Sequence, residues 1–204
     1  INIDVDSKYN NLTYNNITNC RTGVGMRYGA IYDNIVHNWI TNNSVGIWAS
    51  DDLGVSYNNT FYDNYFNNTV NVDDSSTGNF WNVTYDCASG PNIINDSCIG
   101  GNFWSDYNGT DDGSGTYPHN IAGDGVGDTQ LPWQGSTSID NGGDYLPLVP
   151  TTVIYNLTVY IDSVDTTVFN YTGRPYLVDV LVTNSIGSPQ QNKLVGIEEA
   201  NGRN

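Results

Sequence analysis

The sequence predicts an all-β protein whose main part is a right-handed parallel β-helix, a solenoid of stacked coils. Its 204 residues are rich in Asn, Thr, Tyr, Val and Gly, which are moderate or poor helix formers. A block of about 23 residues recurs through the first half of the chain, and its short apolar pieces are separated by Asn or Gly corners. A repeat of this length indicates units that bury their apolar faces only by stacking on one another.

The coils of this solenoid are expected in residues 1–110. The block that starts at Tyr9 returns at Tyr32 and, with one inserted residue, at Tyr57. We expect three residues of these blocks to stack inward at equivalent positions, and we also expect Met26 to stack on Ile47. The three are Ile17, Ile40 and Phe66. The tetrapeptide at 78–81 returns at 101–104, which we interpret as one more coil step. Leucine-rich repeats are excluded because Leu is scarce throughout this region.

Three cysteines, at positions 20, 87 and 98, fit neither a zinc site nor a redox motif. Cys87 and Cys98 enclose a short loop with Gly90 and Pro91, so we expect a local disulfide formed in an oxidising compartment. Cys20 is then the odd cysteine, which we expect to be buried as a small apolar residue, with an intermolecular cross-link as the alternative.

Ten N-x-S/T sequons indicate a glycoprotein if the chain is secreted. Frequent Asn and Thr also create such sequons by chance, so each site has this second explanation. The acceptors are Asn11, Asn16, Asn42, Asn58, Asn67, Asn82, Asn95, Asn108, Asn156 and Asn170.

The segment after the coils has a specific order of motifs: Gly101-Asn102-Phe103-Trp104-Ser105-Asp106-Tyr107, then Gly123 to Thr129, then Asp144-Tyr145-Leu146-Pro147-Leu148. This order resembles the C-terminal end of NosD-like right-handed parallel β-helix proteins, especially archaeal cell-surface ones. The resemblance covers roughly residues 9–149. It implies the β-helix fold for the coils and a closing segment at 111–150.

The Gly/Asp-rich stretch also predicts a calcium site. Asn120, Asp124, the backbone of Val126 and Asp128 occupy positions 1, 5, 7 and 9 of a D-x-D-x-D-G type loop, with Gly125 where the turn needs it. Ala122 stands where the resembling family has Asp, and Leu131 where a calcium loop has Glu. Both departures weaken the site, so Asp106, Asp111 or Asp112 would have to contribute. The alternative is a turn-rich solvated loop.

Residues 151–204 form the third predicted region, a β segment that resembles the opening half of an immunoglobulin-like surface repeat and would be a partial domain of that kind. Strict alternation of apolar residues from Val153 to Ile161, and again from Tyr176 to Val182, predicts antiparallel strands. A third strand is expected around 194–197. About 54 residues are too few for a complete sandwich, so we expect either a truncated domain or strands supplied by a neighbouring copy.

The net charge of −16 excludes nucleic acid and anionic lipid surfaces as default partners. No apolar segment is long enough for a membrane helix. We expect a mature piece of a longer extracellular, cell-surface precursor. Its expected function is structural and not enzymatic. We expect a glycoprotein that binds calcium and assembles with copies of itself into a surface layer, sheath or filament, with extracellular glycans as further partners.

The alternative function is a carbohydrate-binding or carbohydrate-cleaving β-helix. The coils offer few bases for a lyase, and their paired carboxylates, such as Asp51-Asp52, lie in turn-like runs where neighbouring side chains diverge. Copper handling requires clustered soft ligands, whereas the one Met, two His and three Cys are scattered along the chain.

Overall fold

The computed structural model describes residues 1–4, 6–49, 56–135, 139–140, 142–150, 154–161 and 165–172, with side chains described through residue 150. The chain divides into two compact units, Ile1–Thr151 and Thr152–Asn204. The described residues form strands, turns and loops without a helix. A membrane-spanning helix is accordingly not found among them.

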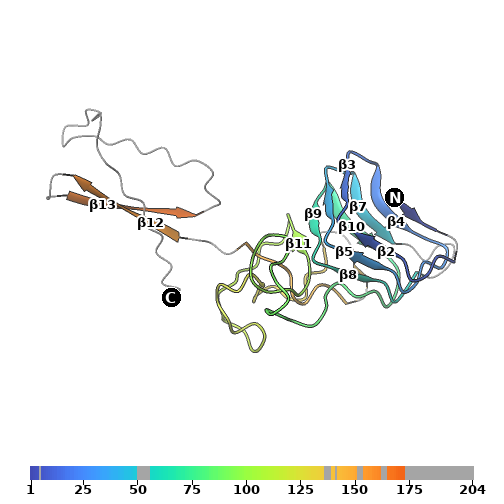
Figure 1. Cartoon of the computed structure of the whole chain (residues 1–204). Coiled ribbons are helices and arrows are strands. Elements are labelled where there is room, and N and C mark those ends of the chain that lie inside the picture. The colour runs from blue at the N-terminus through green and yellow to red at the C-terminus, as the bar shows by residue number, and fades with distance from the viewer. Residues whose placement is uncertain are drawn as a thin grey trace. The chain divides into compact units, whose positions relative to one another are not determined.

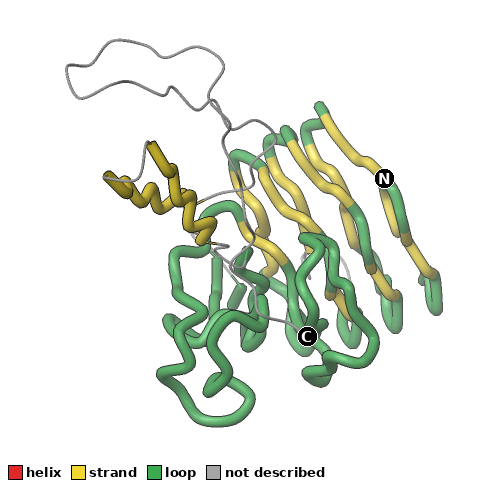
Figure 2. Tube along the Cα trace, turned by 60° about the vertical axis from the view of Figure 1, so that its left-hand side comes forward, coloured by secondary structure: helices red, strands yellow, loops and turns green. Residues whose placement is uncertain are grey.

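The first unit is a stack of coils in which each coil contributes strands to three separate parallel sheets (Figures 1 and 2). One sheet contains β1 (Asn2–Ile3), β4 (Thr22–Met26), β7 (Val45–Ala49) and β10 (Val70–Asp74). The second contains β2 (Asn11–Thr13), β5 (Asn34–Val36) and β8 (Thr60–Tyr62). The third contains β3 (Asn16–Thr18), β6 (Trp39–Thr41), β9 (Tyr65–Asn67) and β11 (Phe103–Trp104). Strands that recur once per coil and pair in parallel define a parallel β-helix, so the predicted fold class is confirmed.

The register of the sheets tests the predicted stacking. Ile17 pairs with Ile40, and Ile40 pairs with Phe66, as expected. The predicted stacking of Met26 on Ile47 is wrong, because Met26 pairs with Ala49 and Val24 pairs with Ile47. Both observed pairs are 23 residues apart, so the repeat length that organises the coils also fixes this register.

Many of the corners between strands share one local design, in which a residue with positive φ is followed by a polar residue that bonds to the next coil. The left-handed φ favours Gly and Asn, yet aromatic residues occupy several of these corners. Before β2, β5 and β8 the corner residues are Tyr9 (60°), Tyr32 (59°) and Asn58 (57°); before β3, β6 and β9 they are Tyr14 (57°), His37 (56°) and Asp63 (53°).

The corner design corrects the interpretation of the tetrapeptides at 78–81 and 101–104. Asn79 accepts hydrogen bonds from Asn59, whereas Asn102 accepts them from Asn64. The two tetrapeptides therefore stand at two successive corners of one coil, and not at the same corner of two coils. The spacing of 23 between them arises because an insertion, which includes the Cys87 to Cys98 loop, lies between the two corners.

A continuous apolar core runs along the stack and becomes aromatic toward its C-terminal end. Phe61 stacks on Trp81 with ring centroids 4.1 Å apart, and Phe66 stacks on Trp104 at 4.4 Å. Trp133, from the segment after the coils, stacks on Trp104 at 4.0 Å. Leu148 forms a parallel bridge with Phe103. Residues after the last complete coil thus continue the stack and cover its core.

The second unit contains an antiparallel hairpin of β12 (Ile154–Ile161) and β13 (Asp165–Thr172), paired from Ile154 with Thr172 to Ile161 with Asp165. The first predicted strand of this region therefore exists. β13 was not expected, although Thr, Val, Phe and Tyr give it strong β propensity. The strands expected at 176–182 and around 194–197 lie outside the described residues.

Candidate functional site

Three hydrogen-bonded ladders of side-chain amides follow the corners of the coil stack. At most steps of a ladder, the backbone N–H and Nδ2 of one Asn donate to Oδ1 of the equivalent residue in the next coil. Cys20 and Asp33 donate through the backbone N–H alone, and the last step of the third ladder joins Asn68 to Asn71, three residues later. One ladder runs Asn15, Asn38, Asn64, Asn102, with donor to acceptor distances between 2.9 and 3.2 Å. A second runs Asn10, Asp33, Asn59, Asn79, and a third runs Cys20, Asn43, Asn68, Asn71.

Each ladder ends on an Asp carboxylate, which accepts hydrogen bonds from the last Asn of the ladder. The three terminal groups are Asp144, Asp74 and Asp106. An Asn side chain both donates and accepts, whereas an ionised Asp side chain only accepts. Asp33, within the second ladder, donates to Asn59 through its backbone N–H alone. Such chains of amides polarise one another in the buried corner.

Asp144 is the most completely buried of these ends. Its Oδ2 accepts from the Asn102 N–H and from Trp104 Nε1, both at 2.8 Å, and its Oδ1 accepts from the Leu146 N–H at 2.9 Å. Burial raises the pKa of Asp144 to about 7, against these opposing hydrogen bonds. Gly101 leaves space for this carboxylate, because a Cβ at that position would lie 1.9 Å from Oδ1.

Asp33 occupies an amide position within the second ladder and does not fit it completely. Its Oδ1 accepts from Asn10, as the Oδ1 of an Asn would. Its Oδ2 therefore stands where the other ladder residues have Nδ2; this oxygen is buried and has no hydrogen-bond partner. In Asn59, the equivalent residue of the next coil, Nδ2 donates to the Ala30 carbonyl and to Asn79.

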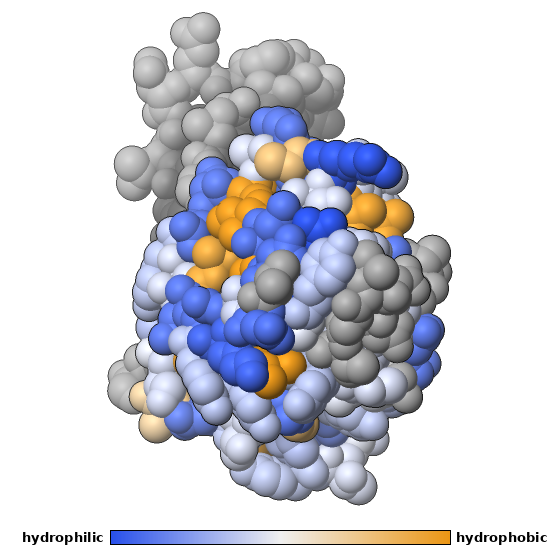
Figure 3. Space-filling model, turned by 90° about the vertical axis from the view of Figure 1, so that its right-hand side faces the viewer, coloured by the Kyte–Doolittle hydropathy of each residue, from blue (hydrophilic) through white to orange (hydrophobic). Residues whose placement is uncertain are grey.

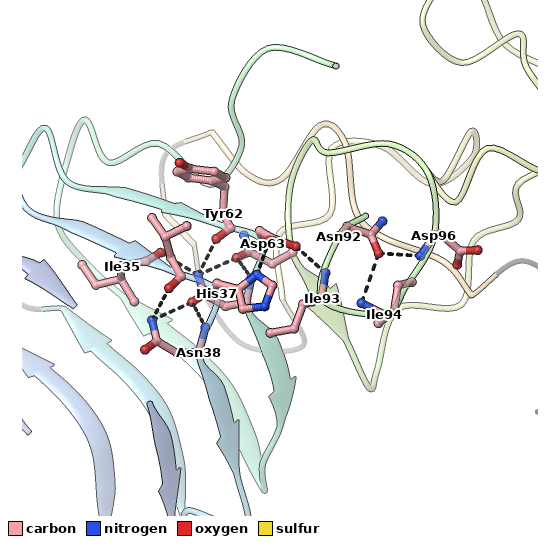
Figure 4. Close-up of polar contacts among 12 residues, drawn as sticks. Ile35, His37, Asn38, Tyr62, Asp63, Asn92, Ile93, Ile94 and Asp96 are labelled. Atoms are coloured by element: carbon pink, nitrogen blue, oxygen red, sulfur yellow. Dashed lines mark hydrogen bonds and ion pairs between the residues drawn. The ribbon is translucent and has the colours of Figure 1, made fainter. Parts of the chain in front are cut away.

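A His–Asp pair lies at the corner before β6 and β9 (Figure 4). His37 Nδ1 is 2.7 Å from Asp63 Oδ2, and Asp63 Oδ1 accepts from the Ile93 N–H at 2.6 Å. The Tyr14 ring packs against the imidazole, with centroids 4.6 Å apart. Burial is the main cause that raises the pKa of Asp63, and the His37 hydrogen bond opposes it.

The pair joins two coils and anchors the inserted loop. When Asp63 is ionised it only accepts, so His37 Nδ1 donates to it. Asp63 also fastens the disulfide-closed loop to the coils through Ile93. The pair therefore couples the coil corner to the inserted loop.

The inserted loop contains the disulfide between Cys87 and Cys98, the pairing indicated by the sequence. Tyr85 connects this region to the Gly/Asp-rich segment, because its hydroxyl donates to Asp124 Oδ2 at 2.6 Å. Burial, together with this contact, raises the pKa of Tyr85. Cys20 is free and exposed, so the expectation that it is buried is wrong. The backbone N–H of Cys20 starts the third ladder, while its side chain lies on the surface of the coil stack.

The residues predicted to bind calcium are only partly brought together. Asp124 Oδ1 accepts from the Val126 N–H at 2.9 Å, and Asp128 Oδ2 accepts from the Gly113 N–H at 2.5 Å. Asn120 is exposed. Asp128 Oδ1 is buried without a hydrogen-bond partner, 3.8 Å from His119 Nδ1.

Asp111 also contacts the Gly/Asp-rich segment. It accepts from the Gly123 and Gly125 N–H groups at 2.6 and 2.8 Å. Burial raises the pKa of Asp111, and repulsion from Asp124 and Asp128 adds to it. Within the part of the chain that the structure describes, no group of three or more His, Cys, Asp or Glu side chains is placed to hold a metal ion.

The sequon residues and the ladder residues are two separate sets. Of the sequon Asn residues with described side chains, six are exposed and two are half-buried. The exposed ones are Asn11, Asn16, Asn42, Asn67, Asn95 and Asn108, and the half-buried ones are Asn58 and Asn82. None of these eight belongs to a ladder. Asn156 and Asn170 pair with each other in the β12–β13 hairpin.

The fold and its ladders define the first unit as a parallel β-solenoid. Residues 4–109 match the sequence profile of the family described as periplasmic copper-binding protein (NosD), and the chain belongs to this family. The family is periplasmic, which places the chain outside the cytoplasm and agrees with its disulfide. Comparisons with curated proteins and with solved structures find no match.

Copper does not fit the residues of this chain. Every Met, His and Cys of the sequence lies in the described part. Met26 is buried in the core, His37 bonds to Asp63, and His119 Nδ1 contacts the Gly127 carbonyl at 2.9 Å. Two of the three cysteines are closed in the disulfide. These soft ligands do not converge on one site, so they do not form a ligand set for copper.

Sequence reasoning missed the ladders and the His37–Asp63 pair. The signal for the ladders was present: in most corners the ladder Asn directly follows the corner residue, as in Tyr9-Asn10, Tyr14-Asn15 and His37-Asn38. The signal for the pair was the 26-residue separation of His37 and Asp63, the same as that of Asn38 and Asn64.

Proposed function

We propose that the chain is a structural glycoprotein of the cell surface, without enzymatic activity, whose coils form a durable scaffold. The observation that carries this proposal is the division of its Asn residues. Asn residues that are mostly buried build the three ladders, while the sequon Asn residues stand outside them, most of them exposed. Glycan-acceptor Asn residues on the surface of a hydrogen-bonded coil stack suit a rigid, glycan-covered support.

The surface of the first unit supports the same proposal. The face in Figure 3 is mainly hydrophilic to neutral, with small hydrophobic patches among polar residues. The net charge of −16 favours solubility and disfavours anionic partners. We also propose that the chain is similar to archaeal cell-surface members of the family and that its second unit is immunoglobulin-like.

Self-assembly into a layer, sheath or filament is the next part of the proposal. Among the described residues the β12–β13 hairpin pairs with no third strand, and a two-stranded hairpin alone is marginally stable. Addition of a strand from another copy would satisfy an edge of such a hairpin, and contacts of this head-to-tail kind propagate. The expected partners are therefore copies of the same chain.

Calcium is proposed for the segment around Asp124 and Asp128. The support is chemical: Asp111, Asp124 and Asp128 repel one another, and Asp128 Oδ1 is buried without a partner. Carboxylate oxygens in this setting attract a hard divalent cation. Chelation should then lower the thermal midpoint, and added calcium should restore it. An unchanged midpoint in both conditions contradicts calcium binding without affecting the scaffold proposal.

Electron microscopy of the native material tests the scaffold proposal. Ordered sheets or filaments are expected for the full chain, and a soluble, unassembled β-helix is expected after deletion of residues 151–204. Site-resolved glycopeptide mass spectrometry should find sugars on exposed sequons such as Asn42. Monomers at high protein concentration, with calcium present, would contradict the assembly.

A further inference from the structure

Three strongly exposed aromatic side chains each stand two residues before a sequon Asn. Tyr9, Tyr14 and Phe80 are 72%, 78% and 53% exposed, and they precede Asn11, Asn16 and Asn82. Two residues of chain span at most about 7 Å, so each ring lies close to its Asn. Each ring therefore shares the outer surface with an acceptor amide.

Two of these rings occupy corners whose backbone does not favour them. Tyr9 and Tyr14 have φ values of 60° and 57°, where residues other than Gly and Asn are disfavoured. Asn58 and Gly78 stand at the corner equivalent to that of Tyr9 in later coils. The turn itself therefore does not require an aromatic residue. Because the rings are exposed, burial in the core does not explain them either.

Asn16 is the acceptor with the most complete aromatic surroundings. It pairs in register with Trp39 of the next coil, whose side chain is 42% exposed. Trp39 stacks on Tyr65 with centroids 4.2 Å apart, and Tyr14 packs against His37 at 4.6 Å. Neighbouring side chains thus support both rings next to Asn16.

Asn11 shows how a neighbouring coil orients an acceptor amide. Asn34 Nδ2 donates to Asn11 Oδ1 at 3.0 Å. The contact holds the amide through its oxygen and not through the nitrogen that would carry a sugar. Tyr9, two residues earlier, stacks on Tyr32 with centroids 5.3 Å apart.

We propose that Asn16 carries an N-linked sugar whose first pyranose ring packs against Tyr14 and Trp39. Asn11 with Tyr9, and Asn82 with Phe80, repeat the arrangement in simpler form. This inference rests on the proposed glycoprotein function and adds which sequons hold their glycan against the protein. The C–H face of a pyranose is weakly electropositive and apolar, so it is attracted to the electron-rich face of an aromatic ring.

The modification requires a sugar activated on a lipid-linked phosphate or pyrophosphate. Nδ2 of Asn16 forms a bond to C1 of that sugar while the bond from C1 to the phosphate oxygen breaks. One amide proton leaves, the phosphate departs with the bonding electron pair, and no atom is oxidised or reduced. Tyr14 and Trp39 act after this step by holding the attached ring.

The test is a double-mutant cycle on the full chain, produced in a host that performs N-glycosylation. Asn16→Gln removes the acceptor, and Tyr14→Asn removes the ring while keeping a residue that tolerates the corner φ. Glycopeptide mass spectrometry reports occupancy at each sequon, and thermal unfolding reports the midpoint. Asn42→Gln is the matched control, because Asn42 is an exposed acceptor that follows the buried Ile40 by two residues.

The expected result is coupling between glycan and ring. Asn16→Gln should lower the midpoint by about 1–4 °C when Tyr14 is present, and by less than about 1 °C in the Tyr14→Asn background. The effect of Asn42→Gln should be the same in both backgrounds. Equal effects of Asn16→Gln in both backgrounds overturn the inference.

Occupancy separates this inference from the proposal on which it rests. Glycan on Asn42 with none on Asn16 overturns the aromatic subsite and leaves the glycoprotein proposal standing. Absence of sugar from every sequon overturns both.

Discussion

Replacing Asp33 by Asn should stabilise the coil stack. Asp33 Oδ1 already accepts from Asn10 as a ladder amide would, and Oδ2 lies buried without a partner. The substitution exchanges that oxygen for an NH₂ group of nearly the same size. In the equivalent Asn59 this group donates to the Ala30 carbonyl and to Asn79. The variant thus completes a ladder without changing the volume of the core.

The expected gain follows from the cost of a buried polar atom that makes no hydrogen bond. Asp33 is 0% exposed, so water does not compensate Oδ2. Leaving such a group unsatisfied costs about 1–3 kcal/mol, and we expect Asp33→Asn to recover an amount of this size. For a chain of this length, each kcal/mol shifts the thermal midpoint by about 2–4 °C.

Thermal and urea unfolding followed by circular dichroism at neutral pH will measure this difference. The matched control is Asn59→Asp, which puts a carboxylate oxygen where Nδ2 now donates. We expect it to lower the free energy of unfolding by at least as much as Asp33→Asn raises it. If Asp33→Asn leaves the midpoint unchanged or lowers it, then Oδ2 is satisfied in solution and the ladder argument is wrong at this corner.

Three further predictions concern the ends and attachments of the stack. The pKa of Asp144 is raised to about 7 from 3.8, so the folded state retains a proton that the unfolded chain releases; stability from this group is present at low pH and is lost as the pH rises from about 4 to about 7. The midpoint should fall over that range, and Asp144→Asn should flatten the fall; an equally steep fall in the variant would contradict the assignment. His37→Asn keeps a residue that tolerates φ of 56° but removes the contact to Asp63, and should reduce the free energy of unfolding by about 1–3 kcal/mol; hydrogen exchange at the Ile93 amide should rise, and unchanged protection there would argue against coupling between corner and loop. Replacing Cys87 and Cys98 by Ser opens a loop of sequence separation 11 and should cost about 3 kcal/mol in urea unfolding; a loss near zero would mean that the contacts of the loop suffice to order it.

The solenoid could be predicted because its repeat length is visible in the sequence. A spacing of 23 links Ile17 to Ile40, and the structure uses this spacing for the register. Met26 was assigned to Ile47 because both are apolar and strand-like. Counting 23 residues from Met26 leads to Ala49, a small residue that hydrophobicity alone does not single out.

The polar part of the site was harder to predict because one residue type has two roles. Asn15 and Asn16 are adjacent in sequence, yet Asn15 donates hydrogen bonds along a corner ladder and Asn16 is an exposed sequon residue. The sequence signals that separate them are the corner residue Tyr14, which Asn15 follows directly, and the sequon that begins at Asn16. The His37–Asp63 contact follows the 26-residue step that also joins Asn38 to Asn64. The Ile93 contact depends on the fold of an insertion and follows no repeat spacing.

The three ladders have a direction, and this direction constrains how the molecule can lengthen. A coil placed ahead of Asn64, Asn59 and Asn68 needs only an amide at each of three corners to join the network. A coil placed beyond Asp144, Asp74 and Asp106 would meet carboxylates that have no proton to donate to it when ionised. Gene duplication can therefore add coils within the stack while the same closing segment is kept. A family of such proteins is expected to vary in its number of coils and to share its last one.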